Sequence, residues 1–268
     1  MQLQCHPIDT PLLAVARLGL YYPLQDWWGD EGFDLLLKSN NGETLVALSV
    51  DARCTPWCKS LVYRLPKDQR TRGCGYALIL VSGQGNEDLV RLLVQDGYAN
   101  VNLVRNDRRT AVSAACSRGR LDIIKYLVEE AQATVDVRTE CDSYISTLAS
   151  ACGAFCSMYT GGSMSLFDVI RYLVEEASDV VNTPIVSGFR DSPLKTATRA
   201  RSLDLVKYLK LKSLFFSSCS ALVQAIEERN LGIIKYLVVE SHCDINHQLQ
   251  WGCNSTALAA AIVNIKHL

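Results

Sequence analysis

Cysteine and histidine are the side chains of this sequence best suited to bind a metal, and they fall into four groups. The groups are Cys54-x-x-x-Cys58, Cys152-x-x-x-Cys156, His242-Cys243 with His247, and Cys253. A structural zinc site needs four converging ligands, usually supplied as two short pairs. None of these groups is a Cys-x-x-Cys pair, so the sequence predicts no metal site. Cys116 and Cys152 are instead expected to fill small-residue positions in helices, and Cys243 to lie at the base of a loop.

A cysteine nucleophile has one local candidate, Cys243, which is flanked by His242 and Asp244. Nucleophilic catalysis requires the cysteine and its base within hydrogen-bonding distance, with the base oriented by a third group. Adjacent residues on a loop rarely reach that geometry. We therefore predict no catalytic residues and no enzyme activity, and a Cys/His hydrolase is the least favoured alternative.

Gly83-Gln84-Gly85 could be mistaken for a phosphate-binding loop. The dinucleotide-binding motif follows a strand, whereas helical patterns lie on both sides of these glycines. The segment is interpreted as a helix-helix turn, and no cofactor is predicted.

Composition narrows the classes of partner and location. The 268 residues carry a formal net charge of −1, which gives no general attraction to nucleic acid or anionic lipid. Apolar runs such as residues 76–81 are far shorter than the roughly 20 residues that span a bilayer. Asp9 and Arg17 interrupt the N-terminal stretch, which does not resemble a signal peptide. We expect a cytoplasmic protein that is not secreted, with a nuclear location left open and with most of its 11 cysteines as free thiols.

Five similar segments are expected to form the framework that carries the cysteine, histidine and glycine residues discussed above. They are EDLVRLLVQ from Glu87, LDIIKYLVE from Leu121, FDVIRYLVE from Phe167, LDLVKYLK from Leu203 and LGIIKYLVVE from Leu231. Apolar residues such as Ile124, Tyr126 and Leu127 recur at helical spacing, which predicts one buried face on each helix. Asn86, Ser202 and Asn230 precede three of the helices as N-caps. The basic residues shared by the five copies are separated by 34, 46, 36 and 28 residues, a spacing typical of solenoids.

A second set of helices, rich in alanine and serine, precedes the first set. Its clearest members are TAVSAACSRG from Thr110, SPLKTATRA from Ser192, SALVQAI from Ser220 and TALAAAI from Thr256. One helix pair of about 34 residues cannot cover its own apolar sides, because ordering each residue costs roughly 1–2 kcal/mol in backbone entropy. Neighbouring pairs are therefore expected to stack on one another.

Local motifs match a known repeat. Thr10-Pro11-Leu12 is followed by Ala16 and Gly19, and Thr110 by Ala115, Cys116 and Gly119. The second helices are followed by Ala99-Asn100-Val101-Asn102, Asp179-Val180-Val181-Asn182 and Cys243-Asp244-Ile245-Asn246. The chain resembles the ankyrin repeat, with its Thr-Pro-Leu-His-x-Ala start, glycine turn and Val-Val-x-Leu-Leu helix. The resemblance implies an all-α solenoid of stacked helix-turn-helix units with short hairpin or loop fingers.

The repeats can be placed along the whole chain as one domain, residues 1–268. Their predicted starts lie near residues 10, 44, 76, 110, 146, 192, 220 and 256, and the last copy is incomplete. The copies lack the usual histidine, and the second helix around residues 56–65 matches poorly. We predict an enlarged loop over residues 155–165 and no room for a finger after Leu211. The aromatic loop of Tyr21, Tyr22, Trp27 and Trp28 is expected to be buried rather than exposed for binding.

The resemblance also implies a function, namely binding a partner protein through the concave face and the finger loops. The residues expected to make contact are Arg105, Asp107, Arg108, Arg118, Arg190, Arg199, Glu227 and Trp251. Arginine and tryptophan are frequent at binding hot spots. We predict a monomeric adaptor without nucleic-acid or membrane partners. The alternative is a targeting fragment of a longer protein with an effector domain beyond the C-terminus.

Overall fold

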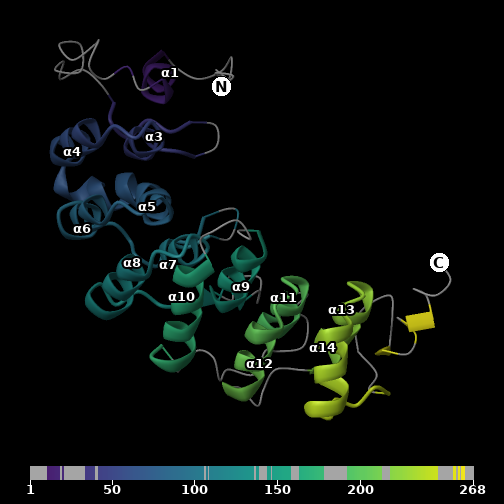
Figure 1. Cartoon of the computed structure of the whole chain (residues 1–268). Coiled ribbons are helices and arrows are strands. Elements are labelled where there is room, and N and C mark those ends of the chain that lie inside the picture. Colours follow the sequence, from purple (N-terminus) through teal and green to yellow (C-terminus); the bar gives the residue numbers. More distant parts are fainter. Residues whose placement is uncertain are drawn as a thin grey trace. The chain divides into compact units, whose positions relative to one another are not determined.

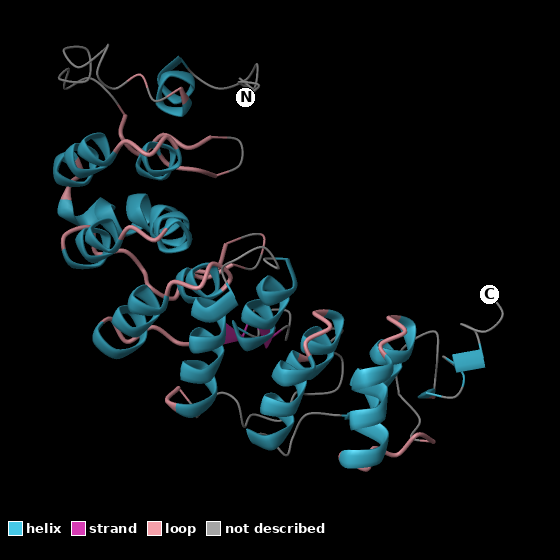
Figure 2. Cartoon of the chain, viewed as in Figure 1, coloured by secondary structure: helices cyan, strands magenta, loops and turns pink. Residues whose placement is uncertain are grey.

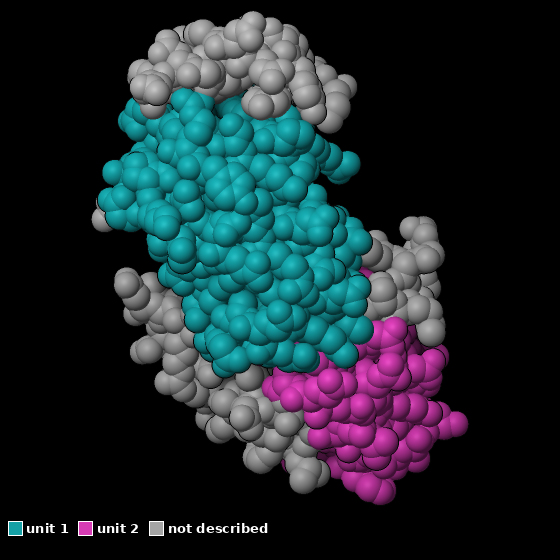
Figure 3. All heavy atoms as spheres, turned by 90° about the vertical axis from the view of Figure 1, so that its left-hand side faces the viewer, with its two compact units in different colours: residues 1–134 teal, residues 135–268 magenta. Residues whose placement is uncertain are grey.

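The computed structural model describes residues 11–18, 20, 34–39, 42–105, 107, 109–135, 137–138, 144–145, 147–157, 163–177, 192–212, 218–246, 256–257, 259 and 261–262. Almost all regular structure in these residues is helical (Figure 2). The chain divides into two compact units, Met1–Thr134 and Val135–Leu268, which Figure 3 distinguishes by colour.

Unit 1 is a stack of helix pairs (Figure 1). Its helices are α1 (Pro11–Arg17), α3 (Leu45–Asp51), α4 (Thr55–Arg64), α5 (Lys67–Gln84), α6 (Glu87–Gln95), α7 (Ala111–Cys116) and α8 (Leu121–Lys125), the last continued by a π-helical turn, η2 (Tyr126–Glu130). The first helices α1, α3, α5 and α7 pack against one another in that order. The second helices α4, α6 and α8 form the neighbouring row.

Unit 2 repeats this arrangement. It contains a short antiparallel hairpin, β1 (Val137–Arg138) with β2 (Tyr144–Ile145), and the helices α9 (Thr147–Ser157), α10 (Ser163–Glu175), α11 (Pro193–Arg199), α12 (Leu203–Lys212), α13 (Ser218–Glu227) and α14 (Leu231–Lys235), the last continued by η3 (Tyr236–Glu240). The first helices α9, α11 and α13 pack in succession, and α12 packs against α14. The predicted all-α repeat fold with hairpin fingers is confirmed.

Side-chain caps explain where many helices begin. The Asn86 side chain accepts a hydrogen bond from the Leu89 amide at 3.2 Å, and Ser202 and Asn230 cap α12 and α14 in the same way. Thr110 forms a capping box with Ser113 at the start of α7. The three N-caps predicted from sequence are therefore confirmed.

Threonine hydroxyls also fasten the start of a repeat to a segment elsewhere in its unit. Thr44 Oγ1 donates to the Gly73 carbonyl at 2.6 Å, and Thr147 Oγ1 donates to the Val135 carbonyl at 2.5 Å. Both threonines are fully buried. The first bond ties the start of α3 to α5, and the second ties the start of α9 to the segment at Val135.

The apolar faces predicted for the second helices form the core. Ile124 and Leu127 are fully buried, and Tyr126 is 4% exposed. Arg91 joins two neighbouring second helices: its guanidinium contacts Glu87 at 2.9 Å and Glu130 at 3.1 Å and lies 4.1 Å from the Tyr126 ring centroid. The stacking of repeats thus rests on apolar burial with charged contacts along its outer edge.

The turns between paired helices have an unusual composition. The residue two positions before the second helix has a left-handed backbone at Arg53 (φ 55°), Gly85 (φ 90°), Gly119 (φ 68°), Arg201 (φ 55°) and Arg229 (φ 55°). Glycine is the usual residue there, because a Cβ costs roughly 1–2 kcal/mol in this conformation. Three of these five turns therefore hold an arginine at an energetic cost.

One first helix begins well before its expected position. The repeat placed near Tyr76 has a first helix, α5, that already begins at Lys67. Gly73 and Gly75 do not end this helix; a Cβ at these positions would lie 2.8 Å and 2.6 Å from Leu65 and Leu103 side-chain atoms, so the glycines permit close packing.

The enlarged loop predicted over residues 155–165 is wrong at both ends. Residues 155–157 extend α9 and residues 163–165 begin α10, which leaves only residues 158–162 between the helices. The poorly matching stretch around residues 56–65 does form a helix, α4.

Several expectations concern residues outside the described part of the chain. The Tyr21, Tyr22, Trp27 and Trp28 loop lies there, as does the segment after Lys212, residues 213–217. The assignment of residues 1–268 to one domain stays a prediction.

Candidate binding surface

Charged side chains gather on the finger that precedes α7. The Arg105 amide donates to the Arg109 carbonyl at 2.9 Å, which closes a tight hairpin-like loop. At its tip the Asp107 carboxylate lies 3.6 Å from Arg105 Nε and 3.7 Å from Arg109 Nε. The finger therefore presents two guanidinium groups around one carboxylate, with an excess of positive charge.

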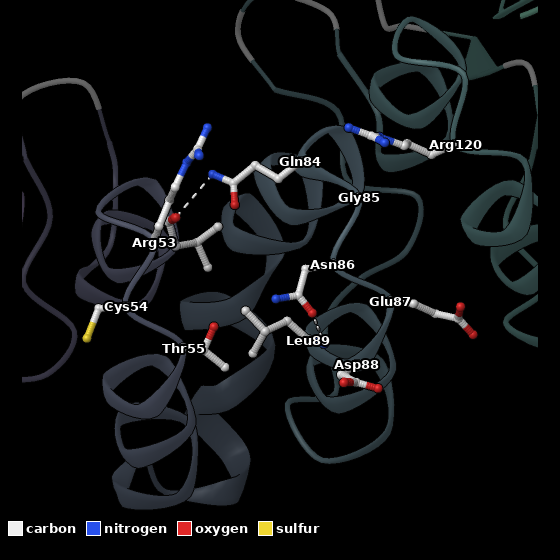
Figure 4. Close-up of a pocket in the computed structure, with 11 residues that line it drawn as sticks. Arg53, Cys54, Thr55, Gln84, Gly85, Asn86, Glu87, Asp88, Leu89 and Arg120 are labelled. Carbon is white, nitrogen blue, oxygen red and sulfur yellow. Dashed lines mark hydrogen bonds between the residues drawn. The ribbon is translucent and has the colours of Figure 1, made fainter. Parts of the chain in front are cut away.

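An open pocket of about 650 Å³ lies at the ends of the first helices that are opposite to the fingers, where the chain turns into the second helices (Figure 4). It is lined by Val50, Arg53, Cys54, Thr55, Gln84, Gly85, Asn86, Glu87, Asp88, Leu89 and Arg120. These residues come from the turns of three successive repeats in unit 1. The pocket is thus a product of stacking, since no single repeat supplies its walls.

Two arginines flank the central turn of this pocket. Gln84 Nε2 donates to the Val50 carbonyl at 3.1 Å, which fixes the Gln84 side chain across the gap between two repeats. In Figure 4, Arg53 and Arg120 lie on either side of Gln84 and Gly85. A Cβ at Gly85 would lie 2.6 Å from Arg120 Nε, so the glycine lets this guanidinium approach the turn closely. The pair of guanidinium groups can bind carboxylates in a bidentate manner.

Among the described residues of unit 1, the predicted contact residues do not gather in one place. Arg105 and Asp107 meet on the finger, whereas Arg118 is exposed in the turn at the other end of α7, a helix of 6 residues and about 9 Å in length. Arg199 and Glu227 are exposed at the C-terminal ends of α11 and α13 in unit 2.

Three of the predicted contact residues, Arg108, Arg190 and Trp251, lie outside the described residues. Sequence reasoning missed Arg53, Gln84 and Arg120. The signal that could have revealed Arg53 is its place in the repeat, where Gly85 and Gly119 stand in the next two copies.

Four of the described cysteines have a raised thiol pKa. Burial raises the pKa of Cys58 to about 11 and the pKa of Cys74 and Cys152 to about 12. Burial, together with the neighbouring Cys219, also raises the pKa of Cys243 to about 12. These four thiols are mostly protonated at neutral pH, so their nucleophilic thiolate form is scarce. Among the described side chains, no three His, Cys, Asp or Glu gather as a metal site.

Within the described ranges, no helix combines the length and the apolar character required to cross a bilayer.

Comparison with known proteins gives the same fold. A family model described as "Ankyrin repeats (3 copies)" matches residues 46–139. The crystal structure of the human ASB11 ankyrin repeat domain superposes with a TM-score of 0.51 at 17% sequence identity, covering 94% of this chain and 92% of that one. No curated protein sequence matches the chain.

These comparisons agree with the stacked helix pairs of each unit. The ankyrin-repeat fold is typically non-enzymatic, and ankyrin repeats are in general protein-protein interaction modules. Residues 46–139 thus match the ankyrin-repeat family model, and the described helices have the ankyrin-repeat fold.

Proposed function

We propose that this chain is an interaction module that binds a partner protein through its charged loops, without performing a chemical reaction. These loops are the fingers and the helix-helix turns at the other ends of the first helices. The buried faces and inter-repeat contacts hold the exposed charged groups on a rigid frame, which limits the entropy lost on binding. The cysteine pKa values favour binding over thiol-based hydrolysis.

The observation that carries the proposal is the arginine at the helix-helix turns. Arg53, Arg201 and Arg229 occupy left-handed backbone positions at which glycine would cost less. Strained residues of this kind are often retained where they serve a function. Arginine is enriched at binding hot spots and recognises carboxylates through two parallel hydrogen bonds. The partner is therefore expected to present acidic side chains to these turns.

The proposal can be tested by affinity capture with three double variants. The first removes charge from the turns (Arg53→Gln with Arg120→Gln), and the second removes charge from the finger (Arg105→Gln with Arg109→Gln). The third, a matched control, changes two exposed lysines, one in α4 and one at the start of α5 (Lys59→Gln with Lys67→Gln). Thermal melting first establishes that all three remain folded.

A protein retained by the original chain and by the lysine control, but lost from the turn or finger variant, supports the proposal and identifies the edge that binds. Equal retention by all four proteins contradicts it, since charge on these edges would then have no part in binding. If only the finger variant fails to retain the partner, the turn arginines are not part of the interface.

A further inference from the structure

Two thiols from separate elements meet at the base of a finger in unit 2. Cys219 is the second residue of α13, and Cys243 follows the π-helical turn η3. Their Sγ atoms are 3.7 Å apart, although 24 residues separate them in sequence. Both lie against the Asp244 carbonyl oxygen, at 3.7 Å and 3.9 Å.

The backbone fixes the direction of the Cys243 side chain. The Cys243 amide donates to the Leu237 carbonyl at 2.9 Å, and His242 before it has a left-handed φ of 49°. Ala99 and Ala133 occupy the same position after α6 and η2, with equivalent bonds to Leu93 and Leu127. Both alanines are buried, so this helix ending turns the Cβ at that position inward. At Cys243 the same geometry aims a thiol at the first helix of its own repeat.

Exposure distinguishes this pair from the other described cysteines. Cys54, Cys58, Cys74, Cys116 and Cys152 are buried, whereas Cys219 and Cys243 are partly exposed. Lys210 Nζ donates to Ser218 Oγ at 2.6 Å, beside the pair. Its ammonium opposes the rise in the Cys243 pKa that burial and Cys219 cause. A small oxidant can therefore reach this pair more easily than any of the five buried thiols.

We propose that Cys219 and Cys243 form a site of reversible oxidation, at which a peroxide converts the two thiols into a disulfide. A disulfide requires an S–S distance of about 2.05 Å, so the sulfurs must approach by roughly 1.7 Å, which side-chain rotation can supply. The proposal is independent of the proposed binding function.

The chemistry balances as a two-electron oxidation. The Cys219 thiolate attacks one oxygen of hydrogen peroxide, the O–O bond breaks and hydroxide leaves, which gives a sulfenic acid. The Cys243 thiolate then attacks that sulfur, the S–O bond breaks and a second hydroxide leaves. The two protons lost by the thiols convert the hydroxides into two water molecules. Cys243 is placed second because its high pKa makes its thiolate scarce, and proximity compensates for this in an intramolecular step.

The disulfide would close a loop that holds the rest of α13, all of α14 and η3. It would also tie the base of the finger that begins at Cys243 to the first turn of α13. Because a crosslink of this kind restricts the unfolded chain, we expect the oxidised protein to melt about 5 °C higher than the reduced protein.

The experiment treats the reduced full chain with one equivalent of hydrogen peroxide, digests it under non-reducing conditions and identifies crosslinked peptides by mass spectrometry. The expected result is a dominant Cys219–Cys243 peptide that dithiothreitol removes. The matched variants are Cys219→Ala and Cys243→Ala, which should lose both the crosslink and the rise in melting temperature. Cys116→Ala, at a buried helical position outside the pair, should keep both.

Oxidation of the chain unfolded in concentrated guanidinium supplies the reference for random pairing. The proposal is overturned if the native chain yields no more Cys219–Cys243 peptide than the unfolded chain does. This comparison needs only the unmodified protein, so it holds even if a cysteine variant fails to fold.

Discussion

Replacing Arg229 by glycine should stabilise the protein. Arg229 holds a φ of 55° in the turn between α13 and α14. Relief of the left-handed backbone stabilises the folded state by about 1–2 kcal/mol. The extra freedom of glycine in the unfolded chain costs about 0.5–1 kcal/mol of that gain. The expected net gain is therefore about 0.5–1 kcal/mol.

Arg201→Gly provides an internal comparison at the same φ. The Arg201 guanidinium pairs with the Glu228 carboxylate at 3.0 Å, and the two side chains are 62% and 27% exposed. An exposed pair of this kind contributes roughly 0.2–1 kcal/mol, which offsets much of the backbone gain. We expect Arg201→Gly to be nearly neutral. Urea unfolding followed by circular dichroism measures both variants, with a higher midpoint and an unchanged slope expected for Arg229→Gly.

Gly42→Ala tests the backbone cost in the opposite direction. Gly42 has a φ of 77°, and a Cβ placed there would meet nothing within 4 Å. Its replacement should destabilise the protein by about 1 kcal/mol through conformation alone. If Gly42→Ala behaves in this way but Arg229→Gly also destabilises, then contacts of the arginine outweigh its strain and the reasoning for the turns is refuted.

Three further predictions concern contacts between repeats. Arg91→Ala should lower the urea midpoint, and a double-mutant cycle with Glu130→Gln should give a coupling energy that shrinks as salt rises. Thr147→Val should cost about 1–3 kcal/mol in urea unfolding, since it leaves a finger carbonyl without its buried donor, whereas Thr147→Ser should retain most of the stability. A hydrogen bond from Lys212 lowers the pKa of Glu175 below its ordinary 4.5, so this contribution to stability is present above pH 4.5 and is lost as the pH falls through the folded-state pKa. Lys212→Ala should move the Glu175 carboxyl titration, followed by NMR, back toward its ordinary value.

Repeat spacing made much of the fold predictable. Thr44, Thr110 and Ser192 were expected to start repeats, and each caps the first helix of its pair. The buried Ile124 and Leu127 follow from helical periodicity in the same way. These features depend on local sequence, which recurs in each copy.

Features that depend on contacts between repeats were harder to predict. Gly73 and Gly75 suggest a turn by themselves, but in the structure they admit Leu65 and Leu103 against a continuous helix. The turn pocket escaped prediction because Arg53 and Arg120 come from different repeats and only stacking brings them near Gly85. The sequence thus shows that these residues are charged, but only the packed structure shows that they lie close together.

The hydrogen bond between neighbouring fingers has a consequence for cooperativity. The Asn102 side chain accepts from the Thr134 amide at 2.8 Å, across 32 residues. Its free energy belongs to the boundary between two repeats rather than to either one, and boundary terms of this kind determine how strongly neighbouring repeats unfold together. A finger is a loop by geometry, yet through this bond it acts as a coupling element that helps to join local folding events into one transition.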